Sequence, residues 1–589
     1  LRLFDSGVEF LQTACGNFLH GGAADFSPAV FMTFSPAMLR FFQKRRGALR
    51  LLVAASGVVA ASLAASAWRW AHAPRAWRAE EVAVAFWSWR AETPRQADVE
   101  RAARETGART LFLRAGQLDF ASGRVSRVRE VRGRMPRGVE LHLVYNATPA
   151  LLAEFERFDE RELAAVAAEA FKRDIARAAR EDGDAKEGAG AKTEEGYGEE
   201  SRSGARVVGL QLDLDVPTRL LARYARVLRE TRALMPPGAR LSVTGLQTWM
   251  GAGDLRGVLE AVDFWSPQLY GAEVPATVER AVPISSLGAV ALSVARAREL
   301  GKPFYAGLAA YGYALLYSEK GKLLGARGDI APARVASDRN FELVERRAFA
   351  SDAGADGARR DAPLASEWRY VFRVRGDAVV EGLIVRAGEQ IVLDVPSSES
   401  LRASVRGVRE GAGEKLLGIC LFRLPASDDP TTLSLAEVSA ALRDREAETR
   451  ARVSVEPARV AEGVGGSPTQ LLLTAENAGA CGALFGEGAL VMTLRVPRGS
   501  VSGVTRLEGF DSFETLCERR AALRPCSAAR ADFIRLGARA WPEGAKARAG
   551  LSFAGAVPDS LPASVAVSRD DGRSWERVES LDVKGAEGR

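Results

Sequence analysis

Histidine is almost missing from this chain of 589 residues, which contains only His20, His72 and His142. Catalytic triads and most zinc sites depend on imidazole nitrogens, so this scarcity argues against a Ser-His-Asp hydrolase and a histidine-based metal centre. His142 falls in an apolar segment, where a core role is commoner than a catalytic one. The sequence therefore predicts neither a metal site nor a cofactor.

Cysteine is also scarce, with five residues and no CxxC spacing. Cys420 lies in an apolar run and is expected to be a buried thiol. Cys517 and Cys526 are separated by a short loop and could pair in an oxidising compartment, which would leave Cys481 without a partner.

A strong excess of one charge is lacking as well. The net charge of +6 is small for this length, and basic and acidic residues are interleaved. Without a basic stripe that contains aromatic residues, a nucleic-acid partner is not predicted. The apolar content of 47% is ordinary for globular proteins. A chain of this length exceeds one hydrophobic core, so two to four domains are expected.

An uncharged apolar run, residues 51–68, follows a basic segment near the N-terminus. This pattern in residues 38–78 fits both a cleavable export signal and an uncleaved membrane anchor, and either sends the rest of the chain across the membrane. Residues 1–37 fit no export pattern, and Met38 is a more natural start. We therefore expect an exported protein of the periplasm or cell envelope.

Eight apolar segments with strand character alternate with helical patterns. They are Glu81–Trp89, Thr110–Leu113, Glu140–Tyr145, Val207–Leu214, Leu241–Leu246, Ala261–Tyr270, Pro303–Leu308 and Leu416–Leu424. This order predicts an α/β fold, a (β/α)8 TIM barrel, with strands one to seven in residues 79–320 and the eighth strand in residues 414–446.

Insertions interrupt the predicted barrel. After a helical stretch over Leu151–Arg180, residues 181–206 are rich in Gly, Glu, Lys and Ser, and are expected to be a disordered insertion. Residues 321–413, between strands seven and eight, begin with a charged and irregular half. Their second half places Trp368, Tyr370, Phe372 and Val374 on one face by strict alternation, which predicts a small β subdomain near the barrel mouth.

In residues 451–589 the pattern changes to short alternating strands separated by Gly, Pro and Asn turns. This pattern predicts a β-sandwich-like domain. Within it, Ser568–Trp575 resembles the Asp-box hairpin of sialidases and other β proteins, where it is a structural turn.

Two carboxylates mark the end of the fourth predicted strand. Asp213 and Asp215 are two residues apart, so both side chains face the same way, at the barrel end where chemistry occurs. Glycosidic cleavage needs two carboxylates. Asp215 is the candidate acid or acid/base, and Asp213 the deeper candidate. The alternatives are that Asp215 caps the helix near Pro217 and that Asp213 is bonded to neighbouring strands.

A further carboxylate is sought at the same end of the barrel. Asp119, just past the second strand, is the third catalytic candidate, and Asp254 follows the fifth strand. Asp263 opens the sixth strand, at the end associated with stability.

Aromatic and amide side chains gather at the predicted strand ends, where they could stack on sugar rings and bond hydroxyl groups. The candidate substrate-binding residues are Trp87, Trp89, Tyr145, Asn146, Gln247, Trp249, Gln268, Tyr270 and Tyr311. Carbohydrate is therefore the expected partner.

The segments LQLDLD, TGLQTW, WSPQLYG and GICLFRLP, in this order, resemble a bacterial family of exported proteins, the domain of unknown function 3142. The resemblance covers about Val82 to Leu442 without the insertions and implies a glycoside-hydrolase-like barrel. More remotely, Asp213-Leu-Asp215 is similar to the central DxD of chitinase-like barrels, and Gln268 and Tyr270 match residues that hold the substrate there. In those barrels a Glu two residues further on supplies the acid, and here that position is Pro217.

Two functions follow as hypotheses, and catalytic activity is left open between them. The first is an exported glycoside-hydrolase-like protein that acts on a polysaccharide or glycoconjugate through Asp213 and Asp215. The second is a non-catalytic glycan-binding or envelope scaffold protein on a degenerate glycosidase barrel.

Overall fold

A computed structural model describes residues 77–189, 205–271, 273–280, 282–348, 368–426, 429–457, 470–484, 489–554, 560–567 and 576–584. The chain divides into two compact units at Ala73/Pro74, and every described residue belongs to the second unit. None of the helices in these ranges is long and apolar enough to cross a bilayer. The apolar run at residues 51–68 and the expected Asp-box hairpin at residues 568–575 lie outside the described residues.

Eight parallel strands of the described chain close into a barrel. They are β1 (Val84–Ser88), β2 (Thr110–Ala121), β4 (Glu140–Ala147), β5 (Arg206–Asp213), β6 (Arg240–Gly245), β7 (Phe264–Pro267), β8 (Phe304–Ala309) and β16 (Leu416–Phe422). Each strand pairs in parallel with the next, and β1 pairs with both β16 and β2, so the ring is closed. The predicted TIM barrel is confirmed, with its strands in the predicted order.

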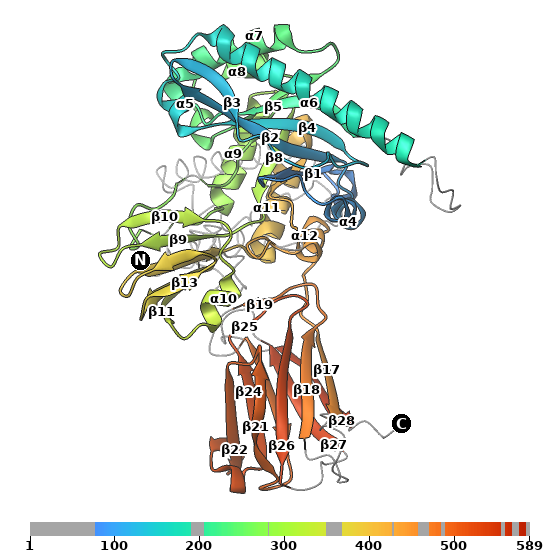
Figure 1. The fold of residues 1–589 in the computed structure, drawn as a ribbon, viewed down its shortest axis with the longest axis vertical. Helices are drawn as coiled ribbons and strands as arrows, with labels where there is room; N and C mark the ends of the chain where they lie inside the picture. Colours follow the sequence, from blue (N-terminus) through green and yellow to red (C-terminus); the bar gives the residue numbers. More distant parts are fainter. Residues whose placement is uncertain are drawn as a thin grey trace, which may run out of the picture. The chain divides into compact units, whose positions relative to one another are not determined.

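Helices pack on the outside of the ring (Figure 1). They are α4 (Gln96–Thr106), α5 (Pro149–Ala153), α6 (Glu160–Ala189), α7 (Leu221–Leu234), α8 (Leu255–Glu260), α9 (Leu287–Glu299), α11 (Ser398–Gly411) and α12 (Leu435–Leu442). Neighbouring helices contact one another, as α6, α7 and α8 do on one part of the ring and α9, α11, α12 and α4 on another.

The helical stretch predicted over Leu151–Arg180 is wrong in its bounds. The structure contains two helices there, α5 and α6, and α6 continues past Arg180 to Ala189. The expected disordered insertion therefore begins with helical residues, because its Ala, Lys and Glu residues are good helix formers and extending an existing helix costs little.

Alternation along β5 separates the two faces of the barrel wall. Leu210 and Leu212 pack in the apolar core between strands and helices. Gln211 faces the interior, where it accepts a hydrogen bond from Trp87 Nε1 (2.8 Å) and donates to the hydroxyl groups of Ser242 (3.4 Å) and Ser266 (3.3 Å). The next inward position on β5 is Asp213.

The insertion after β8 forms a five-stranded antiparallel sheet. In spatial order its strands are β10 (Leu323–Arg327), β9 (Tyr313–Tyr317), β15 (Gln390–Val395), β12 (Trp368–Val374) and β11 (Phe341–Ala348). A helix, α10 (Pro332–Ser337), and a hairpin of β13 (Ala378–Val380) and β14 (Leu383–Val385) accompany it. The predicted apolar face is confirmed, because Tyr370, Phe372 and Val374 share one core and Trp368 packs on it.

The prediction that the first half of this insertion is irregular is wrong. The charged segment FELVERRA forms β11, which lies at the edge of the sheet and pairs only with β12. Charged side chains are common on edge strands because they discourage pairing with other chains, and they hide the strand pattern in the sequence.

A buried ion pair joins two strands of this sheet. Arg369 on β12 lies directly opposite Asp394 on β15, and its Nε and Nη2 donate to the two carboxylate oxygens at 2.7 Å each. Both side chains are at most 1% exposed. The pair is therefore well satisfied, but either partner alone would be a buried charge.

We predict that Arg369→Met lowers the free energy of unfolding of the insertion by about 3–5 kcal/mol, because Asp394 loses its counter-charge in a buried site. Arg369→Met combined with Asp394→Leu should recover most of this loss. Denaturant unfolding of the three chains measures both effects. Equal losses in the single and double variants would contradict this explanation.

The described C-terminal region forms two large antiparallel sheets around one core, together with a short pair, β19 (Ala483–Leu484) and β25 (Ala540–Trp541). The first contains β17 (Ala451–Pro457), β18 (Gln470–Asn477), β26 (Lys546–Phe553) and β21 (Val501–Glu508). The second contains β23 (Ala522–Pro525), β22 (Ser512–Arg519), β24 (Phe533–Ala538), β20 (Leu490–Arg495), β27 (Ser560–Val567) and β28 (Glu576–Lys584). Leu473 and Leu551 of the first sheet meet Met492 and Ile534 of the second in this core. The sandwich-like domain is confirmed.

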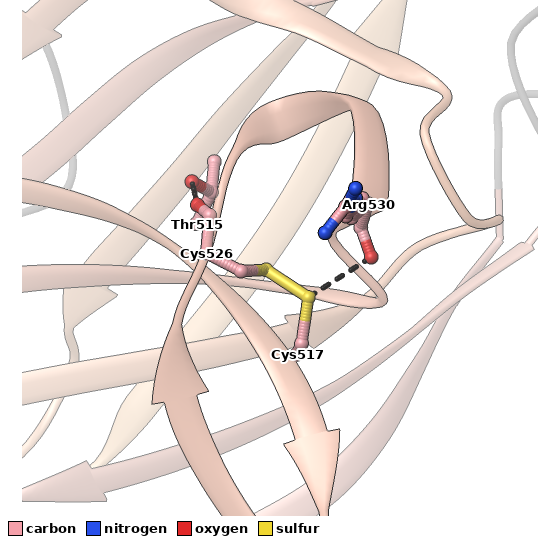
Figure 2. Close-up of a disulfide and its surroundings, with 4 residues drawn as sticks. All are labelled: Thr515, Cys517, Cys526 and Arg530. Atoms are coloured by element: carbon pink, nitrogen blue, oxygen red, sulfur yellow. Dashed lines mark hydrogen bonds between the residues drawn. A yellow bond between two sulfur atoms is a disulfide. The ribbon is translucent and has the colours of Figure 1, made fainter.

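Cys517 and Cys526 form a disulfide across the β22–β23 hairpin, with their Cα atoms 5.8 Å apart (Figure 2). The Thr515 hydroxyl group donates to the carbonyl of Cys526 at 2.6 Å beside it. Cys420 and Cys481 are buried thiols. The expected Cys517–Cys526 pairing and the buried Cys420 are thus confirmed.

We predict that Cys517→Ser with Cys526→Ser destabilises this domain by about 2–3 kcal/mol, because opening a short loop restores entropy to the unfolded chain. Thermal unfolding with and without a reductant measures the effect. The reductant should lower the melting temperature of the wild-type chain and leave the double variant unchanged. A reductant effect that persists in the double variant would contradict the assignment.

Candidate active site at the barrel mouth

The chain turns sharply where it leaves β5. Leu214 and Val216 are buried in the outer core, and the Val216 N–H donates to the Leu214 carbonyl at 2.6 Å. This short bond closes a three-residue turn with Asp215 at its apex, a turn that is common at strand ends. Asp213 is therefore the last residue of the barrel wall, and Asp215 lies just beyond it at the carboxyl end.

Asp213 is held by two neighbouring strands. Its Oδ1 accepts from the Thr244 hydroxyl group (2.5 Å) at the end of β6 and from Gln268 Nε2 (3.5 Å) just after β7. Burial, followed by the negative charge of Asp215, raises the pKa of Asp213 to about 7, although the Thr244 bond and Arg114 oppose this rise. The predicted bonding of Asp213 to neighbouring strands is confirmed.

Asp215 is exposed to solvent and forms no hydrogen bond with any described residue. Burial by the surrounding wall nevertheless raises its pKa. Asp215 is thus a carboxylate at the carboxyl end of the barrel that solvent reaches.

The alternative that Asp215 caps the following helix is wrong. The 3-10 turn Thr218–Leu220 begins after Pro217, α7 begins after Leu220, and neither start receives a side-chain capping bond. The Asp215 carboxylate is therefore not held by a helix cap.

The structure also places the third catalytic candidate, Asp119. Asp119 is not past the second strand but within it, because β2 extends to Ala121 by pairing with β3 (Arg124–Val128). Its carboxylate accepts a hydrogen bond from Thr148, the N-cap residue of α5, and it is not among the charges that shift the pKa of Asp213. Asp119 is thus a support for a helix cap.

Two acids that the sequence ranked lower are also placed. Asp254 is exposed at the start of α8. Asp263 pairs with Arg232 (2.5 Å) and accepts from the Leu241 N–H (2.7 Å) at the amino end of the barrel, as expected.

An aromatic wall lines one side of the mouth. The Phe422 ring lies 5.0 Å from the Tyr311 ring, 5.8 Å from Tyr270 and 5.8 Å from Trp89, between ring centroids. Trp87 lies one layer deeper, almost fully buried in the interior. Phe422 was not among the predicted residues, although its place at the end of the eighth strand could have indicated it.

Tyr145 and Trp249 were predicted at the mouth, and this is wrong. The Tyr145 hydroxyl group donates to Asp174 of α6 at 2.7 Å, outside the barrel wall. Trp249 donates to the Val216 carbonyl at 2.9 Å and packs against Tyr224 of α7. On β4 the residues next to Tyr145 face inward, and a shift of one residue in a strand reverses the face.

Polar residues lie next to the aromatic wall on the neighbouring strands. Asn146 of β4 pairs in register with Asp213 and with Gln117 of β2, which is 7% exposed. Arg114, also on β2, places its guanidinium group 5.4 Å from the centroid of the Trp89 ring. Gln247 is half-buried in the turn after β6. Asn146 and Gln247 were predicted here, whereas Arg114 and Gln117 were missed.

Neither histidine catalysis nor metal binding is indicated by the described residues. His142 is a core residue stacked on Phe112, and burial lowers its pKa to about 3, so it stays neutral. The described residues contain no group of three or more His, Cys, Asp and Glu side chains that could hold a metal ion.

Residues 184–347 match the family model described as "Domain of unknown function (DUF3142)". The chain carries a DUF3142 domain. The matched range includes Asp213, Asp215, Thr244, Gln268 and Tyr270, so a large part of the mouth lies within the DUF3142 match. The resemblance to this family is confirmed.

Solved structures with a similar fold include three bacterial enzymes. A chitinase from Chromobacterium violaceum is 14% identical, with 62% of this chain and 98% of that chain covered and a TM-score of 0.37. The spore cortex-lytic enzyme SleL of Bacillus cereus is 14% identical, with 62% and 74% covered and a TM-score of 0.35. A glycoside hydrolase family 18 N-acetylglucosaminidase from Paenibacillus barengoltzii is 11% identical, with 61% and 99% covered and a TM-score of 0.35. Among curated proteins, none matches the chain.

The raised pKa of Asp213 predicts a pH-dependent stability. Between about pH 4 and pH 7 the folded chain holds this proton more tightly than the unfolded chain does, so the free energy of unfolding falls as the pH rises. Asp213→Asn cannot ionise and should be more stable than the wild-type chain at pH 8, by at most about 4 kcal/mol.

Denaturant unfolding at several pH values between 4 and 8 measures this difference. Asp254→Asn, which changes an exposed acid, is the matched control and should follow the wild-type curve. Wild-type and Asp213→Asn curves that stay parallel across the whole range would show that Asp213 does not titrate there.

Proposed function

We propose that this protein is an exported glycoside-hydrolase-like enzyme that cleaves a polysaccharide or glycoconjugate at the barrel mouth. The observation that carries the proposal is Asp215, a carboxylate at the barrel mouth that solvent reaches and that has no hydrogen-bond partner among the described residues. A carboxyl group whose pKa is raised by its surroundings is suited to donate a proton to a leaving group.

Asp213 acts in this proposal as the second carboxylate. The charge of Asp215 raises the pKa of Asp213, and the Thr244 and Gln268 bonds fix the position of Asp213. When the pair holds a single proton, the other carboxylate can stabilise the positive charge that develops on the sugar ring in the transition state. Asp213 is thus the acid that hydrogen bonds hold in place, and Asp215 is the acid that solvent reaches.

The aromatic wall supports carbohydrate as the ligand class. Trp89, Tyr270, Tyr311 and Phe422 present contiguous rings next to the two acids. Such faces pack against the apolar faces of sugar rings, while the polar side of the mouth can bond hydroxyl groups.

Export is part of the same proposal. A basic segment followed by an apolar run precedes the barrel in the sequence, and the Cys517–Cys526 disulfide suits an oxidising compartment. The anchor and the cleaved signal both agree with a substrate outside the cytoplasm. A membrane-impermeant label applied to cells whose outer envelope has been removed and whose inner membrane is intact should reach the barrel, and protection of the barrel would contradict export.

A glycan-binding protein without catalysis is the second candidate. Pro217 occupies the position at which chitinase-like barrels carry their acid, so the same mouth could bind a glycan and leave it intact. Binding without turnover distinguishes this candidate from the first.

We predict that Asp215→Asn lowers the release of reducing ends from a bacterial polysaccharide by about 10²–10⁴-fold, because general acid catalysis contributes this much. Activity of the wild-type chain should decline as the pH rises above the pKa of Asp215, since the acid must be protonated. The assay screens purified protein against a panel of bacterial polysaccharides. Asp254→Asn is the control and should retain full activity.

Equal turnover by the wild-type chain and Asp215→Asn would remove Asp215 from the mechanism. Retention of a polysaccharide by both chains, with no release of reducing ends by either, would favour the glycan-binding candidate.

A further inference from the structure

Three buried polar atoms without a hydrogen-bond partner belong to β2 and β4, two paired strands of the barrel. They are Arg114 Nε, Gln117 Oε1 and Asn146 Oδ1. Gln117 and Asn146 are paired in register on β2 and β4, and Asn146 is paired with Asp213 on β5. Because buried polar groups nearly always have partners, a cluster of unsatisfied ones beside a candidate active site indicates groups that a ligand completes.

Arg114 points to the interior of the barrel. Phe112, two residues earlier on β2, belongs to the interior cluster, whereas Leu113 and Ala115 pack in the outer core. The Arg114 guanidinium group lies over the Trp89 ring, 5.4 Å from its centroid. This contact holds the cation at the mouth without neutralising it.

Arg114 has no anionic partner in the described part of the chain. It forms no ion pair and no hydrogen bond there, and the charges that act on it are Arg129, which repels it, and Asp213, which attracts it. Asp213 already accepts its hydrogen bonds from Thr244 and Gln268. The mouth therefore contains a half-buried positive charge for which the described protein provides no bonded counter-ion.

We propose that the β2/β4 side of the mouth is a subsite for an acidic sugar residue. Arg114 binds the negatively charged substituent, and Gln117 and Asn146 accept hydrogen bonds from neighbouring hydroxyl groups. The inference rests on the proposed function to the extent that the ligand is a carbohydrate, and it adds the substrate class, an anionic glycan.

The chemistry of the three groups favours an acidic sugar over a neutral one. A guanidinium group offers parallel N–H donors that match the two oxygens of a carboxylate or sulfate. The side-chain oxygens of Gln117 and Asn146 require donors, which sugar hydroxyl groups supply. A neutral sugar would satisfy the two amides and leave Arg114 unpaired, so it should bind more weakly.

The test uses the Asp215→Asn chain, which should bind its ligand without cleaving it. It is offered to immobilised neutral, uronic-acid-containing and sulfated polysaccharides, and the uronic acid polymers are also offered with their carboxylates methyl-esterified. We expect retention of acidic polymers, at least tenfold weaker retention after esterification, and weakening by added NaCl. The uronic and sulfated arms show which anion Arg114 binds.

Arg114→Met in the same background keeps the side-chain bulk and removes the charge, and it should weaken acidic-glycan binding at least tenfold. Arg114→Lys should be intermediate, since it retains the charge but not the paired donors. Arg240→Ala is the matched control, because it removes an arginine at the amino end of β6 and should bind normally. If Arg114→Met does not fold, weaker binding by Arg114→Lys and by the esterified polymers tests whether Arg114 binds the acidic group.

Retention of neutral polymers only, the absence of any retained acidic polymer, or equal binding by Arg114→Met would each overturn the subsite. Failure of the proposed function would give different results from failure of the subsite. Acidic glycans bound through Arg114 but never cleaved by the wild-type chain would refute hydrolysis and leave the subsite standing. Cleavage of neutral glycans through Asp215, with no effect of Arg114→Met, would refute the subsite and leave hydrolysis standing.

Discussion

Inward and outward alternation in a closed ring of strands is the constraint on which the rest of this structure depends. Along β5, Leu210, Leu212 and Leu214 must lie against the helices, and Gln211 and Asp213 must therefore enter the interior. Because the ring has no free edge, no strand can slide by one residue without burying charges among the helices. The position of the acids is thus a consequence of the apolar pattern beside them.

The interior below the acids is polar as well as aromatic. Trp87, Gln211, Ser242 and Ser266 satisfy one another there by hydrogen bonds. A satisfied network is rigid, since moving one member would leave the others without partners in a buried site. This network fixes the residues below Asp213. Asp215, which is closer to the barrel mouth, forms no hydrogen bond with any described residue. The hydrogen-bonded residues around Gln211 are therefore a structural part of the barrel, whereas Asp215 is a carboxylate that solvent reaches.

Much of this arrangement could be predicted from the sequence, and the errors share a physical cause. Apolar runs and turn residues were enough for eight strands, and the spacing of Asp213 and Asp215 was enough for their shared direction. Tyr145 and Trp249 were misplaced because being near a strand end does not settle which face a residue occupies. Arg114 was missed because an arginine within a strand looks like a surface residue until its neighbours close around it. Asp119 was misjudged because the hairpin that lengthens β2 arises from pairing, which local composition does not reveal.

The chain passes from β8 through Tyr311 directly into β9, so one aromatic side of the mouth also begins the added antiparallel sheet. Tyr311 is further tied to Thr432 by an isolated bridge just beyond β16. Changes in the length or packing of that sheet can therefore reshape the rim while the eight-stranded wall stays the same. Sequence changes in this appended sheet would therefore alter the shape of the mouth before the barrel itself changes.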